Sequence, residues 1–114
     1  MIELQVLIGP HALGGELIVP TGARGLVLFA HGSGSSRRSP RNRLVADSLH
    51  HRRLGTLLFD LLSESESHDG ANVFDIALLA QRLLQAMAWV RQQPDVKALK
   101  LGLFGASTGA AAAL

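Results

Sequence analysis

Residues 98–109 of this chain read ALKLGLFGASTG, an apolar run that passes directly into Gly105-Ala106-Ser107-Thr108-Gly109. The run predicts a buried strand, and the alanine-rich residues after the serine predict a helix. A Gly-x-Ser-x-Gly pattern between a strand and a helix is typical of the nucleophile elbow, a sharp turn that presents a serine hydroxyl. Glycine suits the flanking positions because it has no Cβ to obstruct nearby backbone. We therefore predict Ser107 as a nucleophile and Gly105 and Gly109 as structural residues. A tight turn without chemistry is the alternative.

A second glycine-rich motif, His31-Gly32-Ser33-Gly34, follows another apolar run at residues 25–30. Backbone N–H groups in such a loop bind the negative oxygen that forms when a nucleophile attacks an acyl group. A helix that begins at the serine adds the positive end of its dipole. We predict the N–H groups of Ser33 and Thr108 as the oxyanion hole, with Gly32 and Gly34 as structural turn residues. A loop that only reverses the chain is the alternative.

Apolar runs and helical periodicity alternate along the chain. Strands are expected at residues 4–8, 16–19, 25–30, 55–62 and 98–104, and helices at 42–54, at 72–90 and after Ser107. Turns at Gly9-Pro10 and Gly14-Gly15 indicate that the first two strands are antiparallel. The later alternation of strands and helices indicates parallel βαβ units with helices on both faces of the sheet, an α/β fold.

The two internal helices are expected to be amphipathic. In the first, Leu44, Val45, Ser48 and Leu49 recur at helical spacing, and the histidine pair His50-His51 is expected on the surface of the helix end. In the second, Asn72 is the expected N-cap, with Asp75 three positions later. Its apolar stripe is expected to comprise Phe74, Ile76, Leu79, Ala80, Leu83, Met87 and Val90. Residues 63–70 are expected to form a polar loop.

Four segments together resemble the dienelactone-hydrolase-like α/β-hydrolases, including those fused to phosphoribosyltransferases. They are LVLFAHGSGSSRRSPRNRLVA (26–46), GTLLFDLL (55–62), FDIALLAQRL (74–83) and LGLFGASTGAAAAL (101–114). The resemblance implies a three-layer α/β-hydrolase sheet, Ser107 as nucleophile, and hydrolysis of an ester or related acyl bond in a small molecule. Dienelactone hydrolase itself has cysteine at the nucleophile position, so its substrate is not implied.

In this fold the catalytic acid and histidine follow the serine along the chain. The seven residues after Ser107 contain neither. We therefore expect residues 1–114 to be the N-terminal part of one hydrolase domain, truncated after the nucleophile strand and the start of the next helix. Such a chain is expected to be inactive alone, and the strand at 99–104 to be an exposed edge that favours self-association. A non-catalytic fragment, or a subunit completed by another chain, is the alternative.

His31 and Asp60 lie upstream of Ser107 at strand ends where a base or its orienting acid could in principle stand. His31 ends the strand beside the nucleophile strand, and we interpret it as a packing or hydrogen-bonding residue under the oxyanion loop rather than a base. Asp60 ends the strand at 55–62, where a polar loop residue is favoured over one that orients a base.

Composition excludes several classes of protein. A hydrophobic content of 47% excludes a disordered chain, and the absence of cysteine excludes disulfides and thiolate metal sites. No histidines and carboxylates have metal-ligand spacing, and no metal or cofactor is predicted. Without a secretory signal or an apolar run of about 18–20 residues, we expect a cytoplasmic protein that does not span a membrane.

The net charge of +2 comes mainly from arginine clusters at residues 37–43 and 52–53. They lack the interleaved aromatic residues of nucleic-acid sites, so nucleic-acid binding is not predicted. A nucleotide-binding βα turn at Gly105–Gly109 is a weaker alternative, because the G-x-G spacing of dinucleotide sites is absent.

Overall fold

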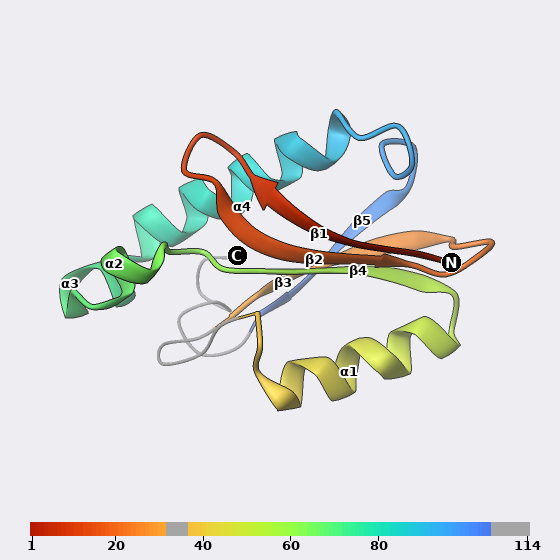
Figure 1. Ribbon diagram of the computed structural model, residues 1–114, viewed down its shortest axis with the longest axis horizontal. Coiled ribbons are helices and arrows are strands. Elements are labelled where there is room, and N and C mark those ends of the chain that lie inside the picture. Colours follow the sequence, from red (N-terminus) through yellow and green to blue (C-terminus); the bar gives the residue numbers. More distant parts are fainter. Residues whose placement is uncertain (32–36, 106–114) are drawn as a thin grey trace.

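The computed structural model of the chain describes residues 1–31 and 37–105. Its strands are β1 (Ile2–Ile8), β2 (Leu13–Val19), β3 (Gly25–Ala30), β4 (Leu54–Phe59) and β5 (Lys100–Gly105). Its helices are α1 (Pro40–His51), α2 (Glu64–Ser67), α3 (Gly70–Val73) and α4 (Ile76–Arg91). The strands form one mixed sheet in the order β1-β2-β4-β3-β5 (Figure 1).

The first two strands are antiparallel, as predicted, and the predicted turn at Gly9-Pro10 is confirmed, but the predicted turn at Gly14-Gly15 is wrong. Gly14 and Gly15 belong to β2, and the chain reverses at residues 9–12. The space around the two glycines explains why they are inside a strand. A Cβ at Gly15 would lie 3.1 Å from side-chain atoms of both Ile8 and Phe59. Here glycine serves close packing of the sheet rather than a turn.

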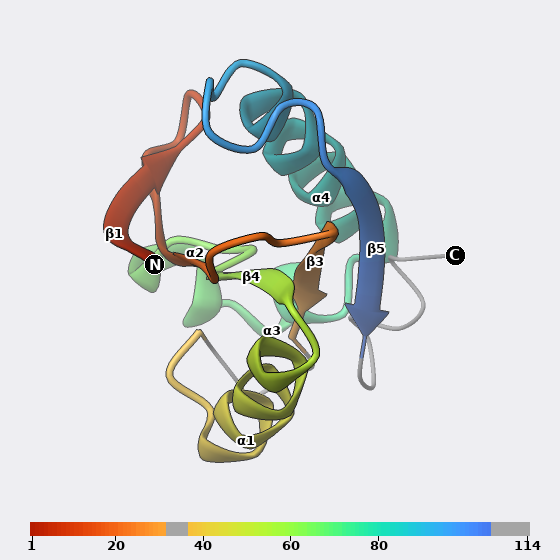
Figure 2. The ribbon, with the colours of Figure 1, turned by 90° about the vertical axis from the view of Figure 1, so that its right-hand side faces the viewer.

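The rest of the sheet is parallel: β4 pairs with β3, and β3 pairs with β5. From β3 the chain moves to β4 on one side, and from β4 it crosses back over β3 to reach β5 on the other side. Because both crossovers keep the same hand, they place α1 and α4 on opposite faces of the sheet (Figure 2). The predicted α/β fold with a helix layer on each face is confirmed.

Alternate residues of the inner strands supply two cores. On the α4 face, Leu26 and Leu28 of β3 pack with Leu57 of β4 and with the buried side of α4. On the α1 face, Phe29 and Leu58 pack around Ala46. Strands that are buried on both faces read as continuous apolar runs. This explains why β3 and β4 are visible in the sequence.

Helix α1 begins two residues earlier and ends three residues earlier than predicted. Ser39 is its N-cap, accepting a hydrogen bond from the Asn42 N–H, and Pro40 occupies the first turn, where a missing N–H costs nothing. The predicted inward position of Leu44 is wrong, because this side chain is 69% exposed. Asn42 and Ala46 are the buried residues of the helix instead.

The connection into α4 is more structured than predicted. Residues 63–70 contain the short helix α2, which begins with a capping box between Ser63 and Glu66. Asn72 lies within the short helix α3, so the predicted cap there is wrong, and Asp75 caps α4 by accepting from the Leu78 N–H. Phe74, which was predicted to face the core, is exposed. Among the described helices, none combines the length and the hydropathy of a membrane span.

Candidate active site

Most of the predicted site lies outside the described residues. This holds for the predicted nucleophile, both oxyanion donors and three structural glycines: Ser107, Ser33, Thr108, Gly32, Gly34 and Gly109. Gly105 is described, and it is the last residue of β5. The structure therefore informs on the site through the strand ends that lead into the two motifs.

The ends of β3 and β5 are neighbours in the parallel ladder. Its last pair is Ala30 with Gly105, and each preceding residue of β3 has its partner in β5 down to Gly25 and Lys100. Both strands therefore finish at the same level of the sheet. The segments 31–34 and 106–109 follow this pair directly in the sequence.

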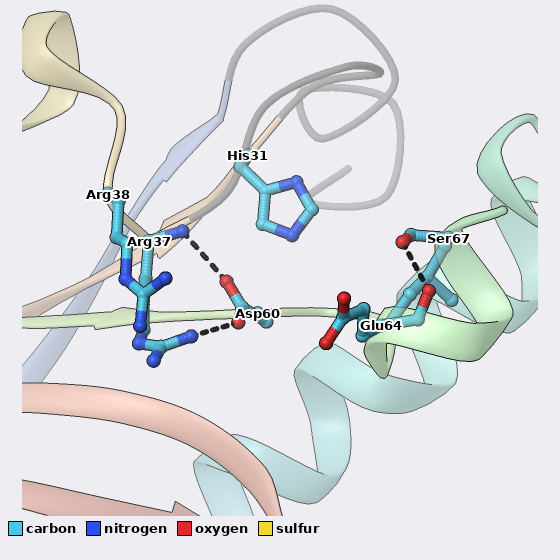
Figure 3. Close-up of a pocket in the computed structure, with 7 residues that line it drawn as sticks. His31, Arg37, Arg38, Asp60, Glu64 and Ser67 are labelled. Carbon is cyan, nitrogen blue, oxygen red and sulfur yellow. Dashed lines mark hydrogen bonds and ion pairs between the residues drawn. The ribbon is translucent and has the colours of Figure 1, made fainter.

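A cavity of about 330 Å³ lies at the same edge of the sheet. Its lining comprises His31, Arg37, Arg38, Asp60, Leu62, Glu64 and Ser67, six of which Figure 3 labels. The position follows from the topology. The chain continues from β3 to α1 on one face of the sheet and from β4 to α4 on the other face. A crevice forms at the carboxyl ends of two neighbouring strands when their connections run to opposite faces. The carboxyl edge of the sheet thus offers a small, mostly polar pocket.

His31 is buried at the end of β3 and faces this cavity (Figure 3). Its Nε2 atom accepts a hydrogen bond of 2.9 Å from the backbone N–H of Leu61. A neutral imidazole that accepts at Nε2 carries its proton on Nδ1, so neither nitrogen offers a free lone pair. In this geometry His31 is a hydrogen-bonding residue, as interpreted from the sequence.

Asp60 lies just beyond β4, and Arg37 holds both of its carboxylate oxygens. The Arg37 N–H donates to Oδ1 at 2.8 Å, and the guanidinium Nη1 donates to Oδ2 (Figure 3). Asp60 is itself fixed by its own N–H, which donates to the Gly14 carbonyl at 2.9 Å. A Cβ on Gly14 would lie 3.0 Å from the Arg37 Cζ atom. The missing side chain of Gly14 therefore leaves room for the guanidinium.

A second ion pair joins the segment after β4 to helix α4. Arg82 of α4 is only 3% exposed and donates to both carboxylate oxygens of Glu66, at 2.8 and 2.6 Å, and to the Leu61 carbonyl at 3.3 Å. The hydrogen bonds from Arg82 lower the pKa of Glu66 to about 2. A bidentate guanidinium–carboxylate pair of this kind is strong and directional. It ties α2 and the segment after β4 to α4.

Sequence reasoning missed this ion pair, although a signal was present. Position 82 falls on the same helical stripe as Leu79, Leu83 and Ala86, all of which are buried. An arginine on a buried stripe requires a carboxylate partner. Glu66 is that partner, but residues 63–70 were predicted to form a polar loop, so its position beside α4 was not expected.

His50 departs from the sequence prediction as well. It is not a surface residue: its Nε2 lies 2.8 Å from the hydroxyl of Thr56, which is fully buried in β4. Burial lowers the pKa of His50. Its neighbour His51 is exposed, as predicted. Within residues 1–31 and 37–105, no group of three histidine or acidic side chains is placed to hold a metal ion.

Comparison with solved structures finds a relative at high sequence identity. Over 98% of its length the chain is 51% identical to a dienelactone hydrolase from Anabaena variabilis, with a TM-score of 0.88. A dienelactone-hydrolase-like promiscuous phosphotriesterase from metagenomic libraries shares the fold, with a TM-score of 0.70 at 19% identity and 98% coverage of this chain. The chain spans 54% and 52% of these two proteins.

Two curated relatives from Mycobacterium tuberculosis, strains CDC 1551 and H37Rv, carry the name "Putative phosphoribosyl transferase". Each is 56% identical over 112 residues, which is 98% of this chain but 25% of the relative. No family model matches the chain. The transferase name thus belongs to proteins of which three quarters have no counterpart here. In both sequence and fold, these 114 residues match the N-terminal half of a dienelactone-hydrolase-like α/β-hydrolase.

Proposed function

We propose that this chain provides the nucleophile side of a serine hydrolase that cleaves an ester or related acyl bond. Ser107 is the proposed nucleophile, and the N–H groups of Ser33 and Thr108 are the proposed oxyanion donors. One observation carries the proposal: the pairing of Ala30 with Gly105, which starts the two motif segments from adjacent positions. A serine and its oxyanion donors must converge within about 3 Å of one reacting group, and adjacent strand ends favour this.

The proposed chemistry is acyl transfer. The hydroxyl oxygen of Ser107 attacks the acyl carbon, the negative charge develops on the carbonyl oxygen, and the two amides stabilise it. A serine hydroxyl is a weak nucleophile unless a base takes its proton. Residues 108–114 contain no acid or histidine, and His31 already accepts from Leu61. We therefore propose that residues 1–114 alone react slowly and that the base comes from chain that the longer relatives possess.

The cavity at the strand ends favours a small substrate. Its volume of about 330 Å³ is at the lower end of ligand pockets, which run from about 300 to 1,000 Å³. Its lining is rich in charged and hydroxyl groups, so a polar acyl compound suits it better than a long alkyl chain. We propose a small, polar ester as the substrate class.

A fluorophosphonate probe tests the proposed nucleophile in the full gene product. We expect covalent labelling at Ser107, located by peptide mass spectrometry, and loss of labelling in Ser107→Ala. Ser67→Ala is the matched control, because Ser67 lines the cavity but follows no elbow pattern. It should label like the wild type. An unlabelled wild type whose ester hydrolysis equals that of Ser107→Ala would contradict the proposal and favour a non-catalytic subunit.

A further inference from the structure

The two ends of segment 32–36 are fastened to two consecutive residues. His31, which precedes the segment, accepts the Leu61 N–H at 2.9 Å. Arg37, which follows it, donates its own N–H to Asp60 at 2.8 Å and adds the guanidinium contact to the same carboxylate. Asp60 and Leu61 directly follow β4. One short stretch of chain therefore sets the entry and the exit of the segment that holds the predicted oxyanion donor.

The Asp60 anchor is itself rigid. Its N–H bonds the Gly14 carbonyl of β2, and it continues directly from the buried strand β4. The Asp60 and Arg37 side chains are 20% and 21% exposed, so their ion pair is partly shielded from solvent. A charge-assisted pair that also binds a backbone N–H fixes both the position and the direction of the chain at Arg37.

We infer that Asp60 is a positioning residue for the oxyanion loop, an inference that rests on the proposed function. Asp60 acts through Arg37 rather than on the substrate. Both of its carboxylate oxygens are already engaged, one by the backbone and one by the guanidinium of Arg37. A carboxylate used in this way is not arranged to orient a catalytic histidine. Its effect on the reaction comes from the geometry of the segment whose end it holds.

The inference predicts a graded loss of turnover in the full gene product. Asp60→Ala removes both hydrogen bonds, and we expect kcat to fall about 10- to 100-fold, because misplacement by about 1 Å costs up to 100-fold. KM should change less than about threefold, since oxyanion stabilisation acts mainly in the transition state. Asp60→Asn keeps a neutral oxygen for the Arg37 N–H and should retain an intermediate kcat.

Glu16→Gln is the matched control. Glu16 is also a partly buried carboxylate, with its side chain 16% exposed, and it accepts from Arg43 at 3.0 and 3.3 Å. This pair joins β2 to α1, and its hydrogen bonds come from Arg43; the Arg37 charge lowers the pKa of Glu16 less than Arg43 does. We expect Glu16→Gln to lower stability while leaving kcat within about twofold of the wild type.

Amide hydrogen exchange measured by NMR reports on the anchor without requiring activity. In Asp60→Ala the Arg37 amide should exchange at least about tenfold faster, because it loses the carboxylate oxygen that accepts its hydrogen bond. Unchanged exchange at Arg37, or a kcat equal to that of Glu16→Gln, would overturn the positioning role. Failure of the proposed function is a different result: no fluorophosphonate labelling of the wild type, whatever the exchange rates.

Discussion

Arg53 follows the end of α1 with its backbone in the left-handed region, at φ +62°. Its N–H bonds the His50 carbonyl at 3.1 Å, and its carbonyl accepts from the Arg24 N–H at 2.9 Å, just before β3. These two hydrogen bonds hold Arg53 in a left-handed conformation, which is unfavourable for residues that have a Cβ. Glycine is the usual residue at such a helix end.

We predict that Arg53→Gly stabilises the chain. Relief of the left-handed penalty should add about 0.5–1 kcal/mol to the free energy of unfolding, measured by urea denaturation. Arg52→Gly removes the same charge from the same helix end, but Arg52 has φ −99°, where glycine brings only backbone entropy. It should destabilise by about 0.5–1 kcal/mol. Equal effects of the two changes would contradict the strain argument.

Single side chains were the hardest features to predict from the sequence. Leu44 and Phe74 were assigned to the core from periodicity, yet both are exposed. Periodicity gives the stripe but not which residues of a helix end reach the sheet. Arg82 shows the reverse case: it is buried, and its partner Glu66 lies 16 positions away in α2, a helix that was not predicted. The catalytic assignment of Ser107 remains a prediction, since the residue lies outside the described part of the chain.

At the scale of elements, the contact between α1 and β4 includes one buried polar pair beside its apolar packing. His50 of α1 meets the buried Thr56 hydroxyl at 2.8 Å. Burial lowers the pKa of His50 more than the nearby Asp47, at 3.8 Å, raises it. The folded chain therefore binds a proton at His50 less readily than the unfolded chain does.

This pair predicts a loss of stability in acid. A histidine with a lowered pKa in the folded state gives its full stability above about pH 6.5, and this stability declines as the pH falls below that value. Urea midpoints measured from pH 8 to pH 5 should fall less in His50→Gln than in the wild type. His51→Gln, the exposed neighbour, should keep the wild-type slope. Identical slopes in all three proteins would show that His50 does not contribute.

Elements were predicted better than their ends. The inner strands β3 and β4 were found because parallel strands covered on both faces have continuous apolar sequences, whereas β5, predicted to be buried, has only partly buried and exposed residues in the described structure. Boundaries failed where a local hydrogen bond decided them. Ser39 and Asp75 cap the helices, whereas Asn72 was expected to cap the second. The Gly14-Gly15 pair was read as a turn, because the sequence does not reveal that Arg37 and Phe59 would need the space.

For the molecule as a whole, β5 is the edge of the sheet among the described residues. It pairs with β3 on one side, and its Leu103 side chain is 40% exposed. An apolar strand with an unpaired edge is a template for pairing with another chain. We propose that the chain self-associates through β5.

Leu103→Lys tests this proposal, because a charged side chain on an edge strand opposes strand pairing between molecules. Sedimentation of the wild type should show mass rising with concentration, and Leu103→Lys should stay closer to monomeric. Leu84→Lys makes the same change on α4, where Leu84 is 63% exposed, and should associate like the wild type. A wild type that is monomeric at every concentration would refute association through β5.

The pairing of Ala30 with Gly105 also has a consequence for synthesis of the protein. These partners are 75 positions apart, so one side of β3 stays uncovered until β5 has left the ribosome. At roughly 5–20 residues per second, this interval lasts several seconds. Throughout it, the growing chain displays an apolar strand edge to its surroundings. Chaperone demand during translation should therefore peak before residue 100 emerges. Mutations that slow the pairing of β5 with β3 should lower the soluble yield more than their effect on the free energy of unfolding suggests.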